Sequence, residues 1–176
     1  MDSLCWNAPT LDFSDQTGTL AAAEPLRHCL ERIKGDWVLD SADLPDLEAA
    51  LDSAVATYPD AWRASVRDRL RAVARVPTRL NISLSWPEVA VSSDGGAGVR
   101  SRPDGVAVPF QDAGEEIWLA TTWKTNRLVQ VFQASDGLRE DAYSLSPEER
   151  RLHLVATTSG DGMPRPLVIT MRFRRP

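Results

Sequence analysis

The sequence predicts an α+β protein in which three N-terminal helices pack on an antiparallel up-and-down β-barrel or half-barrel of about nine to ten strands. Apolar residues recur every three or four positions before Pro77 and alternate with polar residues after it. Short turn signals separate the alternating segments, so consecutive strands are expected to be neighbours in space. A meander of this length is expected to close, or nearly close, because closure protects its edges.

The chain of 176 residues is long enough for one domain with its own core, and we expect a single domain over 1–176. It divides into an arm and helix (1–34), a first strand with a helical insert (35–76) and the β-meander (77–176). Hydrophobic residues make up 43% of the chain and charged residues 26%, which argues against wholesale disorder. The formal net charge of -5 argues against nucleic acid as a partner, because that binding needs a basic footprint.

The sequence contains few signals for export, disulfide formation or metal binding. No apolar run approaches the roughly 20 residues that cross a membrane, so no transmembrane segment is expected. No signal peptide is visible, so the expectation is a cytoplasmic protein or the mature form of an exported (periplasmic) one. Cys5 and Cys29 fit either one disulfide or two reduced thiols. No cofactor or metal is expected, because His28 beside Cys29 lacks a four-ligand set.

The helical half contains three amphipathic segments. The first is expected to begin near Glu24 and Pro25 and to stop at Gly35. The second covers Leu44–Thr57, and Pro59 opens a third that runs to Ala74. The inner stripe of the third helix is predicted to be Trp62, Val66, Leu70 and Val73. Its arginine-rich outer face could lie on a membrane surface, but we favour a solvated face.

The strands are read from their alternation. Gly35–Asp40 suits a first strand that precedes the helical insert. Asp136-Gly137 is expected to form a two-residue type I′ turn, in which both central residues need positive φ. In the later strands, the sets that share one face are Leu80, Ile82, Leu84 and Trp86; Ile117, Leu119, Thr121 and Trp123; Leu128, Gln130, Phe132 and Ala134; and Leu167, Ile169, Met171 and Phe173.

Five large side chains from these sets are predicted to face inward and to line an apolar pocket. They are Trp86, Trp123, Phe132, Met171 and Phe173. The alternative is that they simply fill a packed core. Trp118 has the opposite parity from Trp123, so one of these two tryptophans is expected to face outward or to sit under the helices.

Three segments carry a family resemblance. They are Gly35-Asp36-Trp37-Val38-Leu39, the run 128–132 ahead of Asp136-Gly137, and the closing run 168–173. In this order, with a helical insert and about nine short strands, the chain resembles the intracellular fatty-acid-binding proteins and, more loosely, the lipocalin-like (calycin) group. It also resembles small uncharacterised bacterial proteins with a helical half and such a meander, which bring no function with them.

The closing strand departs from the fatty-acid-binding pattern. The resemblance implies an inward Arg-x-Tyr pair for the ligand carboxylate, but Met171 and Phe173 stand in those two places. Arg172 lies one position off, and the two-residue period of a strand points it to the opposite face. The resemblance therefore implies a ligand that is neutral or is anchored elsewhere.

We therefore predict non-catalytic binding of a small hydrophobic, lipid-like molecule. One alternative is a packed structural or interaction module of the bacterial cell envelope. Another is a cofactor-free barrel enzyme (isomerase or cyclase) that uses Asp141 and Tyr143 as an acid/base pair, although these two are expected on the solvent side. His153 is expected to point away from the apolar face.

Three structural observations would distinguish these functions. An empty apolar cavity would favour binding, a filled interior with an exposed aromatic patch would favour the module, and buried polar groups beside a cavity would favour the enzyme. Nothing in the sequence indicates the oligomeric state.

Overall fold

The protein folds into one ten-stranded antiparallel sheet with helices at its ends. The computed structural model describes residues 19–43, 47–112, 115–148 and 150–176. Its helices are α2 (Thr19–Ile33), α3 (Leu47–Val55) and α4 (Asp60–Val73). Its strands are β1 (Gly35–Asp43), β2 (Arg79–Ser85), β3 (Glu88–Ser93), β4 (Val99–Ser101), β5 (Val108–Asp112), β6 (Glu115–Lys124), β7 (Arg127–Gln133), β8 (Gly137–Leu145), β9 (Arg151–Gly160) and β10 (Leu167–Arg174). The predicted α+β class is confirmed.

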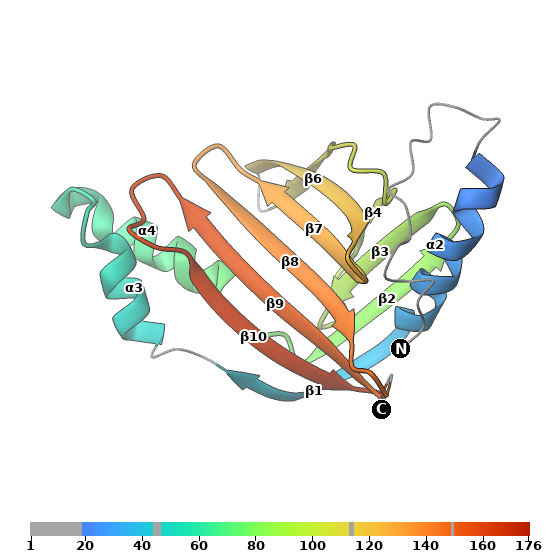
Figure 1. The fold of residues 1–176 in the computed structure, drawn as a ribbon. Helices are drawn as coiled ribbons and strands as arrows, with labels where there is room; N and C mark the ends of the chain where they lie inside the picture. Colours follow the sequence, from blue (N-terminus) through green and yellow to red (C-terminus); the bar gives the residue numbers. More distant parts are fainter. Residues whose placement is uncertain (1–18, 44–46, 113–114, 149) are drawn as a thin grey trace.

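The strand order shows how the meander closes. Consecutive strands pair along both arms of the sheet, in the order β4-β3-β2-β1-β10-β9-β8-β7-β6-β5. β1 pairs with both β2 and β10, so the first strand joins the two arms and the sheet curves into a nearly closed barrel (Figure 1). The segment after β4 approaches β6, where Gly105 N–H donates to the Thr121 carbonyl at 2.8 Å.

Helices lie at both ends of this barrel. α2 lies at one end, and α3 and α4, inserted between β1 and β2, lie at the other (Figure 1). We call α3, α4 and residues 56–59 between them the cap. In the described part of the chain, no helix is long and apolar enough to cross a bilayer.

The main core lies between α2 and the barrel. The buried face of α2 consists of Leu26, Cys29, Leu30 and Ile33, which recur at helical spacing. They pack in one cluster with inward residues of the strands, among them Trp37, Trp123 and Phe173. Cys29 is disulfide-bonded, and Cys5 lies outside the described residues. A second, smaller cluster joins α3 to α4 through Leu51, Ala54, Val55 and Leu70.

Two predictions about the helices are wrong. α2 begins at Thr19 and contains Pro25, although we expected it to begin beside that proline. The run Ala21-Ala22-Ala23 has the highest helix propensity, which offsets the one hydrogen bond that Pro25 removes. In α4, Trp62 is 66% exposed and Val73 is 39% exposed, so only the middle of the predicted stripe packs. Trp62 accordingly belongs to neither of the two described core clusters.

One predicted turn type is also wrong. Neither Asp136 nor Gly137 has a positive φ, and Gly137 is already the first residue of β8. The two-residue turn with positive φ falls instead at Thr125 and Asn126, with φ of 51° and 61°. These residues connect Lys124 to its partner Arg127, a register that requires this mirror-image turn.

Arg175 closes the α2 end of the barrel. Its guanidinium stands 4.3 Å from the centroid of the Trp37 ring and donates to the carbonyls of Arg32 (3.0 Å) and Lys34 (3.2 Å). The Trp37 indole N–H donates to the Ile33 carbonyl at 2.9 Å. A side chain at Gly35 would place its Cβ 2.7 Å from the arginine, so the glycine of Gly-x-Trp leaves room for this contact. The terminal basic cluster thus contributes one residue to the fold.

We expect Arg175→Ala to lower the free energy of unfolding by about 1–2 kcal/mol, the sum of a cation–π contact and charge-assisted bonds to the carbonyls of Arg32 and Lys34. Urea denaturation followed by tryptophan fluorescence measures this difference. The matched control is Arg165→Ala, an exposed arginine in the β9–β10 loop. Equal urea midpoints for the two variants would show that the Arg175 contacts add nothing to stability.

Candidate functional site

The five predicted pocket residues fall into two groups. Trp123, Met171 and Phe173 are buried in the main core, and Trp86, before the bond to Pro87, is packed against it. Phe132 lies apart from this cluster and is half-buried. It stands edge-on to Phe110, with ring centroids 6.1 Å apart. The structure thus brings four of the five together beside α2 and places Phe132 nearer the cap. Trp118, at 44% exposure, is the tryptophan that faces outward.

The inward face differs between the two ends of the barrel. Beside α2, the row Trp123, Leu128, Tyr143, Leu154 and Met171 is fully buried. Toward the cap, burial of the inward face is uneven: Ile117, Phe132 and Thr158 are half-buried. The cross-strand partners of the last two, Leu119 and Leu167, are buried. The barrel interior is therefore packed beside α2 and less completely buried toward the cap.

A row of polar side chains crosses the barrel between these two regions. The register places Thr121 opposite Gln130 and Gln130 opposite Asp141, on three neighbouring strands. Ser101 extends the row, with its hydroxyl oxygen 2.6 Å from that of Thr121. All four residues are buried. We call Ser101, Thr121, Gln130 and Asp141 the polar row; it forms the boundary between the sealed core and the cap-side interior.

Asp141 is the charged member of the polar row, and it forms an ion pair with Arg139. Arg139 Nε donates to its Oδ1 at 2.8 Å, and the Tyr143 hydroxyl lies 3.5 Å from its Oδ2. Burial alone would lower the pKa of the Arg139 guanidinium, but the Asp141 carboxylate outweighs it and raises that pKa. Burial, followed by the negative charge of Asp141, raises the pKa of the Tyr143 hydroxyl well above its usual range. The cluster is therefore an internally neutralised pair beside a hydroxyl that keeps its proton.

The expectation that Asp141 and Tyr143 face solvent is wrong. Arg139, Asp141 and Tyr143 alternate with Leu138, Glu140 and Ala142, and both sets mix polar with apolar residues. Periodicity therefore could not decide which set points inward. The decisive signal was the register with β7, because Gln130 and Leu128 stand opposite Asp141 and Tyr143. Sequence reasoning thus missed the polar row.

His153 faces outward, as predicted, between Arg172 of β10 and Ser144 of β8. Partial burial lowers its pKa, and the positive charges of Arg172 and Arg151 lower it further. The unfolded chain therefore binds the proton at a higher pH than the folded protein does. We expect stability to be lost through this residue as the pH falls below the unfolded value of about 6.5.

His153→Gln is expected to make unfolding less sensitive to pH between neutral pH and this acidic range, because the side chain no longer titrates. Thermal unfolding scans at stepwise pH values test this. The comparison is with the wild-type protein at the same ionic strength. A wild type and variant that lose equal stability on acidification would contradict the assignment.

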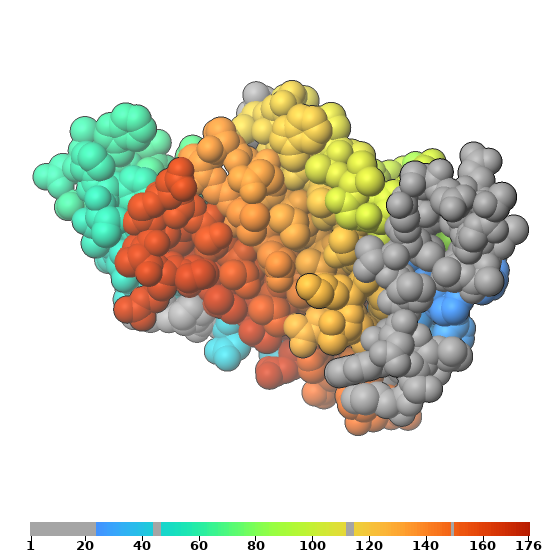
Figure 2. All heavy atoms as spheres, turned by 45° about the horizontal axis from the view of Figure 1, so that its top comes forward, coloured from blue at the N-terminus to red at the C-terminus, as the bar shows by residue number. Residues whose placement is uncertain are grey.

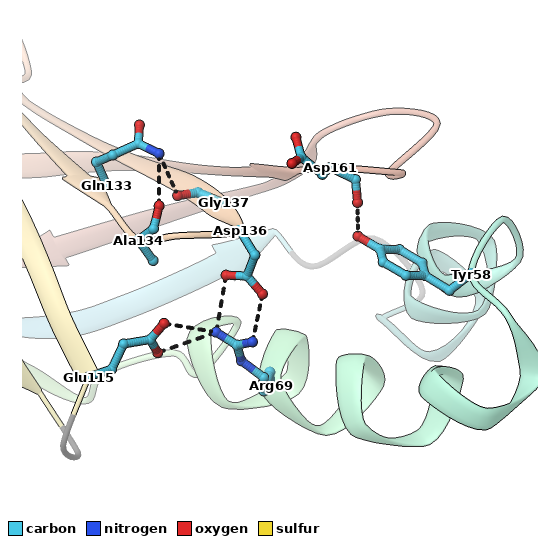
Figure 3. Close-up of polar contacts among 8 residues, drawn as sticks. All are labelled: Tyr58, Arg69, Glu115, Gln133, Ala134, Asp136, Gly137 and Asp161. Carbon is cyan, nitrogen blue, oxygen red and sulfur yellow. Dashed lines mark hydrogen bonds and ion pairs between the residues drawn. The ribbon is translucent and has the colours of Figure 1, made fainter.

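Polar contacts fasten the cap to the barrel. Arg69 of α4 reaches Asp136 in the β7–β8 turn at 2.6 Å and Glu115 at the start of β6 at 3.2 Å (Figure 3). The Tyr58 hydroxyl donates to the Asp161 carbonyl in the β9–β10 turn. The space-filling view shows the cap lying directly against this turn (Figure 2). Arg139 also donates to the carbonyl of Val73 in the last turn of α4, which links the cap to the interior cluster.

We expect Arg69→Ala to increase hydrogen exchange in α3 and α4 while the free energy of unfolding changes by no more than about 1 kcal/mol, because both ion pairs are half-exposed. Hydrogen exchange followed by mass spectrometry measures the change. Arg71→Ala is the matched control, because Arg71 pairs with Glu48 and Asp68 inside the cap. The same exchange pattern in both variants would contradict a specific role of Arg69 in fastening the cap.

A groove of about 540 Å³ lies on the cap itself, at the start of α3 and the end of α4. It is lined by Leu47, Asp68, Arg71, Ala72, Ala74, Arg75 and Val76. Its charged side chains already pair, Arg71 with Glu48 and Asp68, and Arg75 with Asp94 at 3.8 Å. It therefore offers an open, charge-balanced surface, in contrast to the buried polar row.

Solved structures share this architecture. The chain is similar to a protein described as the REP1-NXSQ fatty acid transporter, with 15% identity and a TM-score of 0.53 over 83% of this chain and 97% of that one. Human cRBP IV gives 16% identity and a TM-score of 0.52 over 82% and 98% of the two chains. The fatty-acid-binding protein of Manduca sexta gives 15% identity and a TM-score of 0.51 over 81% and 98%.

The chain has the fold of the fatty-acid-binding proteins and related calycin barrels. This confirms the resemblance drawn from Gly35-Asp36-Trp37, since β1 lies between β2 and β10 and carries the helical insert after it. No protein-family profile and no curated protein sequence matches the chain. At these identities the likeness establishes the fold alone.

Proposed function

We propose that the protein binds a small hydrophobic, lipid-like molecule, without catalysis, in the cap-side part of the barrel interior. The observation that carries the proposal is the half-buried state of the inward side chains Ile117, Phe132 and Thr158 at the cap end of the barrel. Phe132 and Phe110 supply an apolar wall there. Of the other predicted lining residues, Trp123, Met171 and Phe173 would form the closed end beneath the polar row, with Trp86 packed against them.

The similar structures support this proposal by their own descriptions. One is named as a fatty acid transporter and another as a fatty-acid-binding protein. In this chain the inward positions Met171 and Phe173 are apolar and buried, and Arg172 is exposed on the opposite face. The proposed ligand is therefore not held by a charged pair on the last strand.

Titration with the neutral, environment-sensitive dye Nile red tests the proposal. We expect one dye molecule per chain, and at least about tenfold weaker binding to Thr158→Trp, because overpacking the interior costs about 1–3 kcal/mol. Thr157→Trp is the matched control, since Thr157 neighbours Thr158 and points to the opposite face. It is expected to bind the dye within about twofold of the wild type. Absence of dye binding, or equal binding by the two variants, would contradict an interior site.

The buried polar cluster favours a second candidate, the cofactor-free barrel enzyme. Asp141 and Tyr143 converge in the buried interior, 3.5 Å apart, as an acid/base pair would require. However, Asp141 is already bonded to Arg139, and a tyrosine with a raised pKa is a poor base near neutral pH. The cluster is therefore better suited to binding a polar group than to moving a proton. Turnover of a bound ligand, detected by mass spectrometry, would reverse this preference.

A further inference from the structure

The outer face of strands β6 to β10 is mostly apolar across its middle. These five strands lie side by side in the sheet (Figure 1). Their register aligns five outward residues in one central row, Ala120, Val131, Glu140, Thr157 and Val168. The neighbouring rows add Trp118, Val129, Leu138 and Val155. Within these three rows, all of which the structure describes, Glu140 is the one charged residue. Depletion of charge at the centre of a surface is typical of protein–protein interfaces.

Basic side chains border this face at the α2 end of the strands. We call this set the basic belt; its members are Lys124, Arg127, Arg151, His153, Arg172 and Arg174. Among them, and within the described part of the chain, Arg151 alone forms an ion pair, a long one to Asp40 at 3.9 Å. The arginines of α4, in contrast, each pair with a carboxylate. The charge of the basic belt therefore remains available to a partner.

The opposite end of the same face, beside the cap, is acidic. Glu116 is exposed at the start of β6, and Asp161 is exposed in the β9–β10 turn, with its carboxylate pointing away from the cap (Figure 3). We call these two residues the acidic edge; neither forms an ion pair with another described residue. Arg165 offsets part of the charge at this end, as Asp40 and Glu148 do at the belt end. Charge is therefore segregated along the strands, basic at one end and acidic at the other.

This segregation makes the face complementary to itself in one symmetric arrangement. A twofold axis parallel to the strands would place one basic belt on the other, which repels. A twofold axis along the central row turns one copy end for end, so each basic belt lies over the acidic edge of the other copy. On β6, Lys124 and Glu116 lie four residues from Ala120 in opposite directions, so this axis places Lys124 over Glu116. The same spacing on β9 and its following turn places His153 over Asp161.

From this pattern we infer that the protein forms a twofold-symmetric dimer with a second copy of itself, packed through the outer face of β6 to β10. The inference is independent of the proposed function, because the outer face leaves the barrel interior free. Strand spacing and rise give the face a width of roughly 20 Å, a length of roughly 27 Å and an area of about 500 Å² per copy. This area is below the roughly 800 Å² per partner of a standard interface, so we expect weak association, with a Kd of about 10–500 μM.

Sedimentation velocity of the full chain at stepwise concentrations up to about 500 μM tests the inference. We expect the wild type to associate at low salt, and about 1 M salt to weaken the association at least threefold. Reversing the belt with Lys124→Glu/Arg172→Glu, or the edge with Glu116→Lys/Asp161→Lys, is expected to weaken association at least about tenfold. Wild-type protein that stays monomeric over the whole range at low salt would overturn the inference.

An equimolar mixture of the two charge-reversed variants shows which surfaces meet. In the mixed pair the reversed belt faces the reversed edge, so opposite charges meet on both sides of the axis. The mixture is expected to recover the wild-type affinity within about threefold, which also shows that both variants fold. Arg100→Glu/Arg102→Glu, on exposed residues in and after β4, matches the charge change of the belt variant and is expected to associate within about twofold of the wild type. A mixture no tighter than its separate variants, or equal weakening in this control, would overturn the inference.

Glu140→Gln tests the position of the axis. Glu140 lies in the central row, so the proposed arrangement brings its carboxylate close to that of the second copy, where like charges repel. We expect this variant to associate at least about threefold more tightly than the wild type. The matched control is Glu148→Gln, an exposed glutamate outside the three rows, which is expected to leave the affinity within about twofold. Unchanged or weaker association of Glu140→Gln would overturn the central-row arrangement.

Discussion

Asp141→Ala is expected to lower the free energy of unfolding by about 2–4 kcal/mol. Removing one partner of a buried ion pair leaves the other charge uncompensated, which typically costs about 3–5 kcal/mol. We expect a smaller loss than this because the Arg139 side chain keeps 24% of its surface exposed, so water partly solvates its charge. Urea denaturation at neutral pH measures the loss, and Asp141→Asn, which keeps neutral hydrogen bonding, is expected to lose less.

The double variant Arg139→Met/Asp141→Leu is the control for this prediction. Replacing both charges by apolar groups of similar size is often neutral or stabilising, so the double variant is expected to be more stable than Asp141→Ala. If Asp141→Ala loses less than about 0.5 kcal/mol, the pair is not buried in the way described, and the neutral character of the interior would be in doubt.

Trp37→Ala is expected to lower the free energy of unfolding by about 3–5 kcal/mol, as truncation of a buried tryptophan does. Trp37 is fully buried in the main core, donates to the Ile33 carbonyl and carries Arg175 over its ring. One change therefore removes packing, a hydrogen bond and the cation–π contact that ties the C-terminus to α2.

The matched control is Trp118→Ala on the outer face of β6, where the side chain is 44% exposed. It is expected to change the free energy of unfolding by no more than about 1 kcal/mol. Thermal unfolding followed by far-UV circular dichroism compares the two variants. Similar losses in both would contradict the role of Trp37 as the link between α2 and the barrel.

The barrel could be predicted because buried and exposed side chains alternate along most of the length of its strands. In β10, Leu167, Ile169, Met171 and Phe173 are all buried, and the residues between them are exposed or half-buried. In β6 the same alternation placed Trp123 inside and Trp118 outside. The break at Pro77 separated helical from strand periodicity, and β2 begins two residues later, at Arg79.

Two of the remaining errors have a common physical origin, because contacts between distant segments decided them. Trp62 has helical spacing but belongs to neither of the described core clusters. The start of α2 is a different error, because the alanine run before Pro25 was a local signal that we did not use. The polar row was missed because a strand with polar residues on both faces has no periodic signal, so only pairing with β7 places Asp141 inside. Gln130 was placed on the correct face, but its neighbours Thr121 and Asp141 follow only from the pairing of three strands.

Native mass spectrometry of the protein purified from its own host tests the central claim most directly. The account predicts a co-purifying apolar molecule, at one per chain, that is absent from Thr158→Trp and present in Thr157→Trp. Wild-type protein that is bare from the host, and that remains bare after incubation with a total lipid extract, would contradict ligand binding in the barrel.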